Sequence, residues 1–201
     1  MKKNKEMDIV FLLDRSGSMA NNVKDTIGAY NSYLKKQKEK KYNSKITTIL
    51  FDNEYEILYK RESITEVKEL TEKEYYVRGC TALLDAIGKS ITDLDKVSKN
   101  NKVLFVITTD GLENASKNYT KEQIKELIIG HSNWEFLYIG ADIDSYSEGT
   151  SLGISHNNIA NYKKTKEGTR ALFNSIDCAT NMLYECSNIN GNWKSFLNKE
   201  E

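Results

Sequence analysis

The sequence contains no proline and no long apolar run, and it has only three cysteines, Cys80, Cys178 and Cys186. An odd number of cysteines without a C-x-x-C pair argues against a disulfide framework and against a structural zinc site. A membrane-spanning helix needs about 18 or more consecutive apolar residues, so no span is expected. The amino-terminal segment also lacks the uninterrupted apolar region of a signal peptide. We therefore expect a cytoplasmic protein.

The chain carries no excess of either charge. Its 29 Lys and Arg residues balance its 29 Asp and Glu residues. Nucleic-acid binders usually show a basic excess, so we expect no nucleic-acid partner. With 39% hydrophobic residues in 201 positions, the chain is apolar and long enough to bury a core, and we expect one folded domain over residues 1–201.

Enzyme signatures are also scarce. The only histidines, His131 and His156, stand in no motif that would serve a serine nucleophile. No glycine-rich phosphate loop is present. A phosphatase of the haloacid-dehalogenase type would need a second aspartate two positions after Asp14, where Ser16 stands. We therefore expect a protein that is not an enzyme.

Strand-like and helix-like segments alternate along the chain, which is typical of a mostly parallel sheet with helices on both faces. The connection of residues 52–54 is so short that it predicts an antiparallel hairpin, whose second strand lies at a sheet edge. We therefore predict a doubly wound α/β fold with its core over about residues 7–185 and a polar tail over about 188–201. The predicted strands are Asp8–Leu13, Lys45–Phe51, Tyr55–Arg61, Val103–Thr109, Trp134–Ile139 and Asn158–Tyr162.

Three short polar segments each follow a predicted strand or precede a predicted helix. Ligands of open α/β sheets bind beyond the carboxyl ends of the strands, so these segments are expected to meet. They contribute two carboxylates and three hydroxyls, all hard oxygen donors of the kind that magnesium prefers, and no sulfur or imidazole that would favour zinc or copper. The five expected metal-site residues are Asp14, Ser16, Ser18, Thr81 and Asp110.

The same residues resemble a known motif. Asp14-x-Ser16-x-Ser18, together with Thr81 and Asp110, is similar to the metal-ion-dependent adhesion site (MIDAS) of von Willebrand factor A (VWA) domains. The apolar run before Asp14 and the segment from Gly79 to Ala86 also look like that family, and the order of elements fits over about residues 7–185. The resemblance implies a bound Mg²⁺ or Mn²⁺, reached by the hydroxyls of Ser16, Ser18 and Thr81, with Thr81 binding directly or through water depending on the conformer. The two aspartates are expected to neutralise its charge mainly through bound waters and hydrogen bonds.

It also implies a function. Such a metal keeps an exchangeable position that an Asp or Glu carboxylate of a partner protein can take. Similarity to small stand-alone bacterial and phage VWA proteins, including the tellurite-resistance type, implies a cytoplasmic adaptor. Integrin-like relatives carry extra acidic residues after the second serine, where this chain has residues 19–22 without any, so a second metal site is not expected. The expected partner-binding rim is Gly79, Glu113, Asn114, Asp142 and Asp144.

Other interpretations remain open for these residues. Ser16, Ser18 and Thr81 are common helix N-cap residues, and Asp110-Gly111 is compatible with an ordinary turn. The rim residues are compatible with solvated loops. At the level of function, the alternatives are a metal-assisted phosphoester hydrolase, for which no base is evident, and a structural module in which the metal only stabilises the fold.

Overall fold

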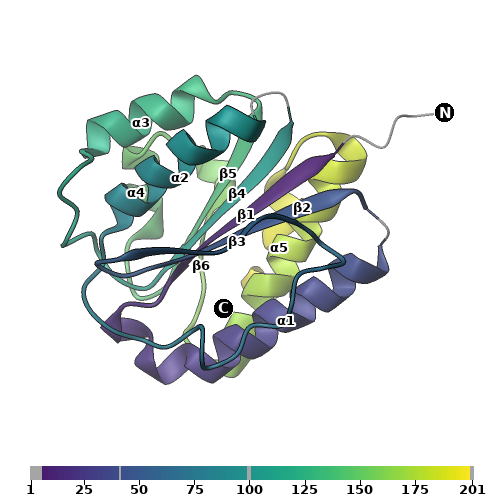
Figure 1. Cartoon of the computed structure of the whole chain (residues 1–201), viewed down its shortest axis with the longest axis horizontal. Helices are drawn as coiled ribbons and strands as arrows, with labels where there is room; N and C mark the ends of the chain where they lie inside the picture. The colour runs from purple at the N-terminus through teal and green to yellow at the C-terminus, as the bar shows by residue number, and fades with distance from the viewer. Residues whose placement is uncertain (1–5, 41, 99–100, 200–201) are drawn as a thin grey trace.

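A computed structural model of the chain describes residues 6–40, 42–98 and 101–199 (Figure 1). Its centre is a six-stranded sheet with the strand order β3-β2-β1-β4-β5-β6. The strands are β1 (Met7–Asp14), β2 (Ser44–Phe51), β3 (Tyr55–Ser63), β4 (Lys102–Thr109), β5 (Trp134–Gly140) and β6 (Ile159–Asn161).

All neighbouring strands run parallel except the pair of β2 and β3. The antiparallel strand β3 lies at one edge of the sheet, as the short connection after Phe51 predicts. The mostly parallel, doubly wound α/β architecture expected from the sequence is therefore confirmed. The expected strands are all present, with ends that differ from the prediction by at most two residues.

Helices cover both faces of the sheet (Figure 1). They are α1 (Val23–Glu39), α2 (Leu83–Ser98), α3 (Lys121–Gly130), α4 (Ser145–Ser151) and α5 (Lys166–Cys186). Within the described residues, no helix is long and apolar enough to cross a membrane.

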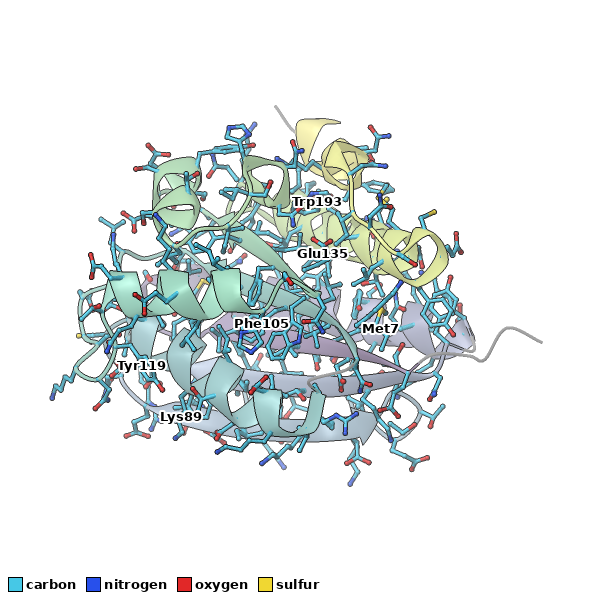
Figure 2. The ribbon with its side chains drawn as sticks, turned by 90° about the horizontal axis from the view of Figure 1, so that it is seen from above. Met7, Lys89, Phe105, Tyr119, Glu135 and Trp193 are labelled. Atoms are coloured by element: carbon cyan, nitrogen blue, oxygen red, sulfur yellow. The ribbon has the colours of Figure 1, made fainter. Side chains whose placement is uncertain are left out.

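The side chains of β1 divide between two hydrophobic clusters because successive residues of a strand point to opposite faces. Ile9 and Phe11 belong to the cluster that also contains residues of α1 and α5. Val10 and Leu12 belong to the cluster beneath α2 and α3. Figure 2 shows Phe105 of β4, a member of the second cluster, between the sheet and these helices. The strand is buried along its whole length, so its carboxyl end has a fixed position.

The segment of residues 64–82, between β3 and α2, has neither helix nor strand, and the sequence pattern predicted no such element there. It is nevertheless anchored, because Ile64, Val67, Leu70 and Tyr75 are buried in the cluster beneath α1 and α5. The segment ends in the loop that carries Thr81.

The carboxyl-terminal segment corrects the prediction of a polar tail outside the core. It forms a 3-10 helix, η3 (Gly191–Lys199). Trp193 is fully buried and its indole Nε1 donates to the Asn157 carbonyl at 2.8 Å. Leu197 also joins the core. The core therefore extends beyond residue 185, and Figure 2 shows Trp193 near the carboxyl-terminal helices.

Candidate metal site

The sheet topology brings the loops of the predicted site to one edge. Strand β1 lies between β2 and β4, and all three run parallel. Asp14 is the last residue of β1 and pairs in register with Phe51, the last residue of β2. Asp110 directly follows β4. The two aspartates therefore leave the sheet side by side.

Asp14 is buried and held by two hydrogen bonds. Its Oδ1 accepts from the Ser16 backbone N–H at 2.7 Å, and its Oδ2 accepts from the Thr109 hydroxyl at 2.6 Å. Burial raises the pKa of the Asp14 carboxyl, outweighing the hydrogen bonds from Ser16 and Thr109 that lower it, and the charge of Asp110 adds to the rise. A buried carboxylate of this kind gains from a nearby cation.

The two serines of the first loop lie together at the site. The hydroxyls of Ser16 and Ser18 are 3.1 Å apart, and the Ser18 hydroxyl donates to Asp110 Oδ1 at 2.5 Å. Ser16 is buried, whereas Ser18 is exposed. These contacts link the loop after β1 to the loop after β4 and leave the site open to solvent at Ser18.

Thr81 reaches the site from the loop before α2. Its backbone exchanges two hydrogen bonds with Asn114, which donates to the Thr81 carbonyl at 3.0 Å and accepts from the Thr81 N–H at 2.9 Å. A Cβ atom placed on Gly111 would lie 3.0 Å from the Thr81 hydroxyl and 3.6 Å from the Ser18 hydroxyl. The hydroxyls of Thr81 and Ser18 thus lie on the same side of Gly111, and a side chain at residue 111 would crowd both.

The chemistry of this donor set fits a divalent cation. Three hydroxyls and two carboxylates, all neutral or anionic oxygens, converge on one partly open volume, which suits Mg²⁺ or Mn²⁺. No group of three or more His, Cys, Asp or Glu side chains in the described part of the chain is arranged to hold a metal. The candidate site therefore depends on its hydroxyls. Asp14, Ser16, Ser18 and Asp110 are joined by direct hydrogen bonds.

Lys164 is a member of the site that sequence reasoning missed. It lies between β6 and α5, and its Nζ contacts Asp110 Oδ2 at 3.1 Å and Asp142 Oδ2 at 2.8 Å. The hydrogen bond to Asp142 raises the pKa of Lys164, against the opposing effect of burial, and Asp110 adds to the rise. No short motif marks this lysine in the sequence, because only the packing of three loops brings it to the site.

A buried ion cluster lies beside the site and was also missed. Arg15 is fully buried, with its Nε 3.0 Å from Asp52 Oδ2 and its Nη1 2.7 Å from Glu56. Arg78 contacts the same Asp52 oxygen at 2.8 Å. The Asp52 carbonyl accepts from the N–H of Ala82, next to Thr81. Asp52 thus connects the loop of Ser16 to the loop of Thr81. Its position directly after β2, a parallel neighbour of β1, is the sequence feature that could have predicted its place beside the site.

The rim residues Gly79, Glu113 and Asn114 hold the site loops together. The Gly79 carbonyl accepts from the Gly17 N–H at 3.2 Å, and Gly79 has a positive φ of 67°. Glu113 accepts hydrogen bonds from the backbone N–H groups of Leu84, at the start of α2, and of its own loop. Asn114 forms hydrogen bonds with the Thr81 backbone, so all three residues fix the positions of the loops that carry the candidate metal ligands.

The other two rim residues differ from each other. Asp142, with a positive φ of 55°, meets the site through Lys164. Asp144 is the N-cap of α4, where its carboxylate accepts from the Ser147 N–H at 3.0 Å. The contacts of Asp144 are those of a capping residue.

Asp85, in the first turn of α2, fixes the loop that follows Asp110. Its carboxylate accepts from the backbone N–H groups of Lys117, Asn118 and Tyr119 at 2.8–3.0 Å. Burial acts to raise the pKa of Asp85, but these hydrogen bonds outweigh it and the pKa is lowered. In Figure 2, Tyr119 lies at the opposite end of the molecule from Met7, the first residue of β1. The loop that Asp85 holds therefore lies at the end of the sheet where β1 finishes.

Solved structures share this fold at low sequence identity. The minor pilin PilB from Streptococcus sanguinis has a TM-score of 0.70 at 10% identity, over 94% of this chain and 64% of that chain. The ArnB paralog VWA2 from Sulfolobus acidocaldarius has a TM-score of 0.60 at 17% identity, over 88% of this chain and 45% of that chain. Proximal thread matrix protein 1 from the mussel byssus, in a structure with a zinc-occupied MIDAS motif, has a TM-score of 0.60 at 14% identity, over 86% and 45%.

The chain spans less than two thirds of the length of each of these three proteins. Identities this low indicate a common fold and no more. No curated protein matches the sequence. The model of the von Willebrand factor type A domain family, by contrast, matches residues 8–180, which is most of the chain. The chain therefore belongs to the von Willebrand factor type A domain family.

Proposed function

We propose that this chain is a metal-dependent protein-binding module. In this proposal a divalent cation, bound by Asp14, Ser16, Ser18, Thr81 and Asp110, accepts an Asp or Glu carboxylate of a partner protein. The observation that carries the proposal is the convergence of three hydroxyls and two buried carboxylates beside the exposed Ser18.

The hydrogen bonds of the site indicate a division of labour among these residues. Both oxygens of Asp14 already accept hydrogen bonds, so this aspartate orients the loop of Ser16 and contributes charge. Asp110 orients Ser18 in the same way. The hydroxyls of Ser16, Ser18 and Thr81 are then the direct donors. A cation with mostly neutral ligands keeps much of its charge, which favours an incoming carboxylate.

Hard oxygen donors favour Mg²⁺ or Mn²⁺ as the bound ion. The mussel relative with a zinc-occupied MIDAS motif makes Zn²⁺ a necessary comparison in any test. We propose binding rather than catalysis because the contacts of both histidines lie elsewhere. His131 contacts the Leu127 carbonyl and Asp95, and His156 packs against Tyr146.

Thermal unfolding in EDTA, Mg²⁺, Mn²⁺, Ca²⁺ and Zn²⁺ tests the site directly. We expect Mg²⁺ or Mn²⁺ to raise the unfolding midpoint of the wild type but not of Asp14→Ala. The stabilisation by a ligand that binds only the folded state is about 2.7 kcal/mol at a hundredfold excess over Kd. Asp144→Ala is the matched control, because it removes an acidic cap outside the donor set and should keep the full metal-induced shift.

A wild-type midpoint that no metal changes would contradict the proposal. A metal-induced rise of the unfolding midpoint would also be seen if the metal only stabilised the fold, so partner binding needs a separate test. For that purpose, capture of binding proteins with and without EDTA is compared between the wild type and Ser18→Ala. Loss of the same captured protein in EDTA and in the variant supports binding, whereas capture independent of both contradicts it.

A further inference from the structure

Lys164 is a cation placed inside a group of three carboxylates. Its Nζ bridges Asp110 and Asp142, and Asp110 lies beside Asp14 through the loops of adjacent strands. The Lys164 side chain is 27% exposed and that of Asp142 is 64% exposed, whereas that of Asp110 is fully buried. The bridge therefore spans from the buried donor set to the solvent beside it.

The sign of the charges decides what this lysine does. The three aspartates and Lys164 together carry two net negative charges, which a divalent cation neutralises. Without the lysine the same site would carry three negative charges and would still be negative after the cation binds. A positive charge at residue 164 therefore repels an incoming metal ion and attracts an incoming carboxylate.

We propose that Lys164 couples the two ligands of the site: it weakens binding of the metal alone and strengthens binding of a carboxylate to the metal-loaded site. This inference rests on the proposed function. A carboxylate that binds the metal-loaded site more tightly than the metal-free site must, by thermodynamic linkage, increase the affinity of the site for the metal by the same factor. Lys164 thus makes stable metal occupancy depend on the partner.

Calorimetric titration of Mn²⁺ into metal-free protein at low ionic strength tests the first half. We expect Lys164→Met to bind Mn²⁺ roughly threefold to tenfold more tightly than the wild type, the range for a partly exposed charge. Lys164→Arg keeps the charge and should bind like the wild type. Lys166→Met removes an exposed charge two positions away and should change Kd by less than about twofold.

Acetate replacing chloride at constant ionic strength tests the second half. We expect acetate to tighten Mn²⁺ binding more in the wild type than in Lys164→Met. Because all variants meet the same free Mn²⁺, chelation by acetate in solution cancels from the comparison. Unfolding in EDTA checks that each variant is folded, and if Lys164→Met is not, Lys164→Gln replaces it.

The outcomes separate the two proposals. Wild-type protein that binds no Mn²⁺ overturns the proposed function and this inference with it. Wild-type binding with Lys164→Met no tighter overturns the inference alone. An equal effect of acetate on both proteins also overturns it, because the lysine would then act on the metal without coupling it to the carboxylate. The coupling is supported if Lys164→Met binds Mn²⁺ more tightly than the wild type, if this difference decreases at high salt, and if acetate tightens Mn²⁺ binding less in the variant than in the wild type.

Discussion

Strand β1 carries one buried aspartate near each end, Asp8 and Asp14, and the two are only 1% exposed. The charge of Asp8 is compensated within the protein, because its Oδ1 accepts a hydrogen bond from Arg61 Nε at 2.7 Å and its Oδ2 accepts one from the Asn101 amide at 2.8 Å. Asp14 accepts hydrogen bonds from the Ser16 backbone N–H and the Thr109 hydroxyl, and among the described residues it has no ion pair.

This difference separates a structural carboxylate from a candidate ligand-binding one. A buried charge is stable in a fold when a cation and hydrogen bonds compensate it, and Asp8 meets that condition. Of the two aspartates of the candidate metal site, Asp110 contacts one cation among the described residues, Lys164, and Asp14 contacts none. The missing positive charge at that end is what a bound metal would supply.

The largest expected effect comes from exchanging the compensated aspartate. Asp8→Asn should lower the unfolding free energy by about 2–3 kcal/mol, because it removes a buried charge pair whose arginine is partly exposed. The loss should be the same in EDTA and in Mn²⁺. Asp14→Asn should change the unfolding free energy in EDTA by less than about 1 kcal/mol and should abolish the gain from Mn²⁺. Urea unfolding with and without metal measures both.

The comparison between the two ends would fail in either of two ways. A stability loss in Asp8→Asn that depends on metal would show that the two ends are not independent. A large loss for Asp14→Asn in EDTA would show that Asp14 is already compensated without metal.

The next effect tests how rigidly the site end is built. Gly79→Ala should lower the unfolding free energy by about 1–3 kcal/mol, because φ is +67° and the new Cβ would lie 1.8 Å from Asn53 Oδ1. The metal-induced shift should weaken as well, since the Gly79 carbonyl accepts from Gly17 in the serine loop. Gly28→Ala in α1 is the control. Its Cβ meets nothing within 4 Å, so it should stabilise by about 0.5–1 kcal/mol. Equal stability of the two variants would contradict the prediction.

The smallest effect is a difference in titration between two aspartates at the site end. Asp14 has a pKa raised above, and Asp85 a pKa lowered below, the ordinary value of 3.8. Ionised Asp85 stabilises the fold above pH 3.8, and this contribution is lost as the pH falls through its lowered pKa. Ionised Asp14 has the opposite sign without metal: the unfolding free energy decreases as the pH rises from 3.8 through its raised pKa.

Carbon-13 NMR titration of the carboxyl groups in EDTA measures both pKa values. Spectra of Asp14→Asn and Asp85→Asn assign the two resonances. We expect the Asp14 resonance to titrate at a higher pH than that of Asp85, and the reverse order would contradict the difference between them.

Several parts of the fold and site could be predicted from sequence because their cause is local or periodic. Apolar and β-branched runs predicted the buried central strands, and the three-residue connection after Phe51 predicted the antiparallel edge. Asp14 and Asp110 could be placed together because both follow strands of one parallel sheet. The same rule places Asp52, which follows β2, at that edge of the sheet. The sequence pattern assigned Asp52 only to the hairpin connection and did not predict its ion pair with Arg15.

Other parts could not be predicted because their cause is long-range. Lys164 reaches Asp110 across 54 positions of sequence, through a loop without a motif. Ile189, Trp193 and Leu197 recur at helical spacing, but the space that Trp193 fills is created only by the assembled helices and η2 (His156–Asn158). Whether so short an apolar pattern is buried depends on the packing of the whole molecule.

The chain has two tryptophans, and the sheet separates them. Trp134 belongs to the cluster beneath α2 and α3, and Trp193 to the cluster beneath α1 and α5. Each layer of the domain thus has its own intrinsic fluorophore. Variants that keep one tryptophan at a time would follow the two layers separately during denaturation. Coincident emission curves would identify unfolding as one cooperative transition, and separated curves would show which layer melts first.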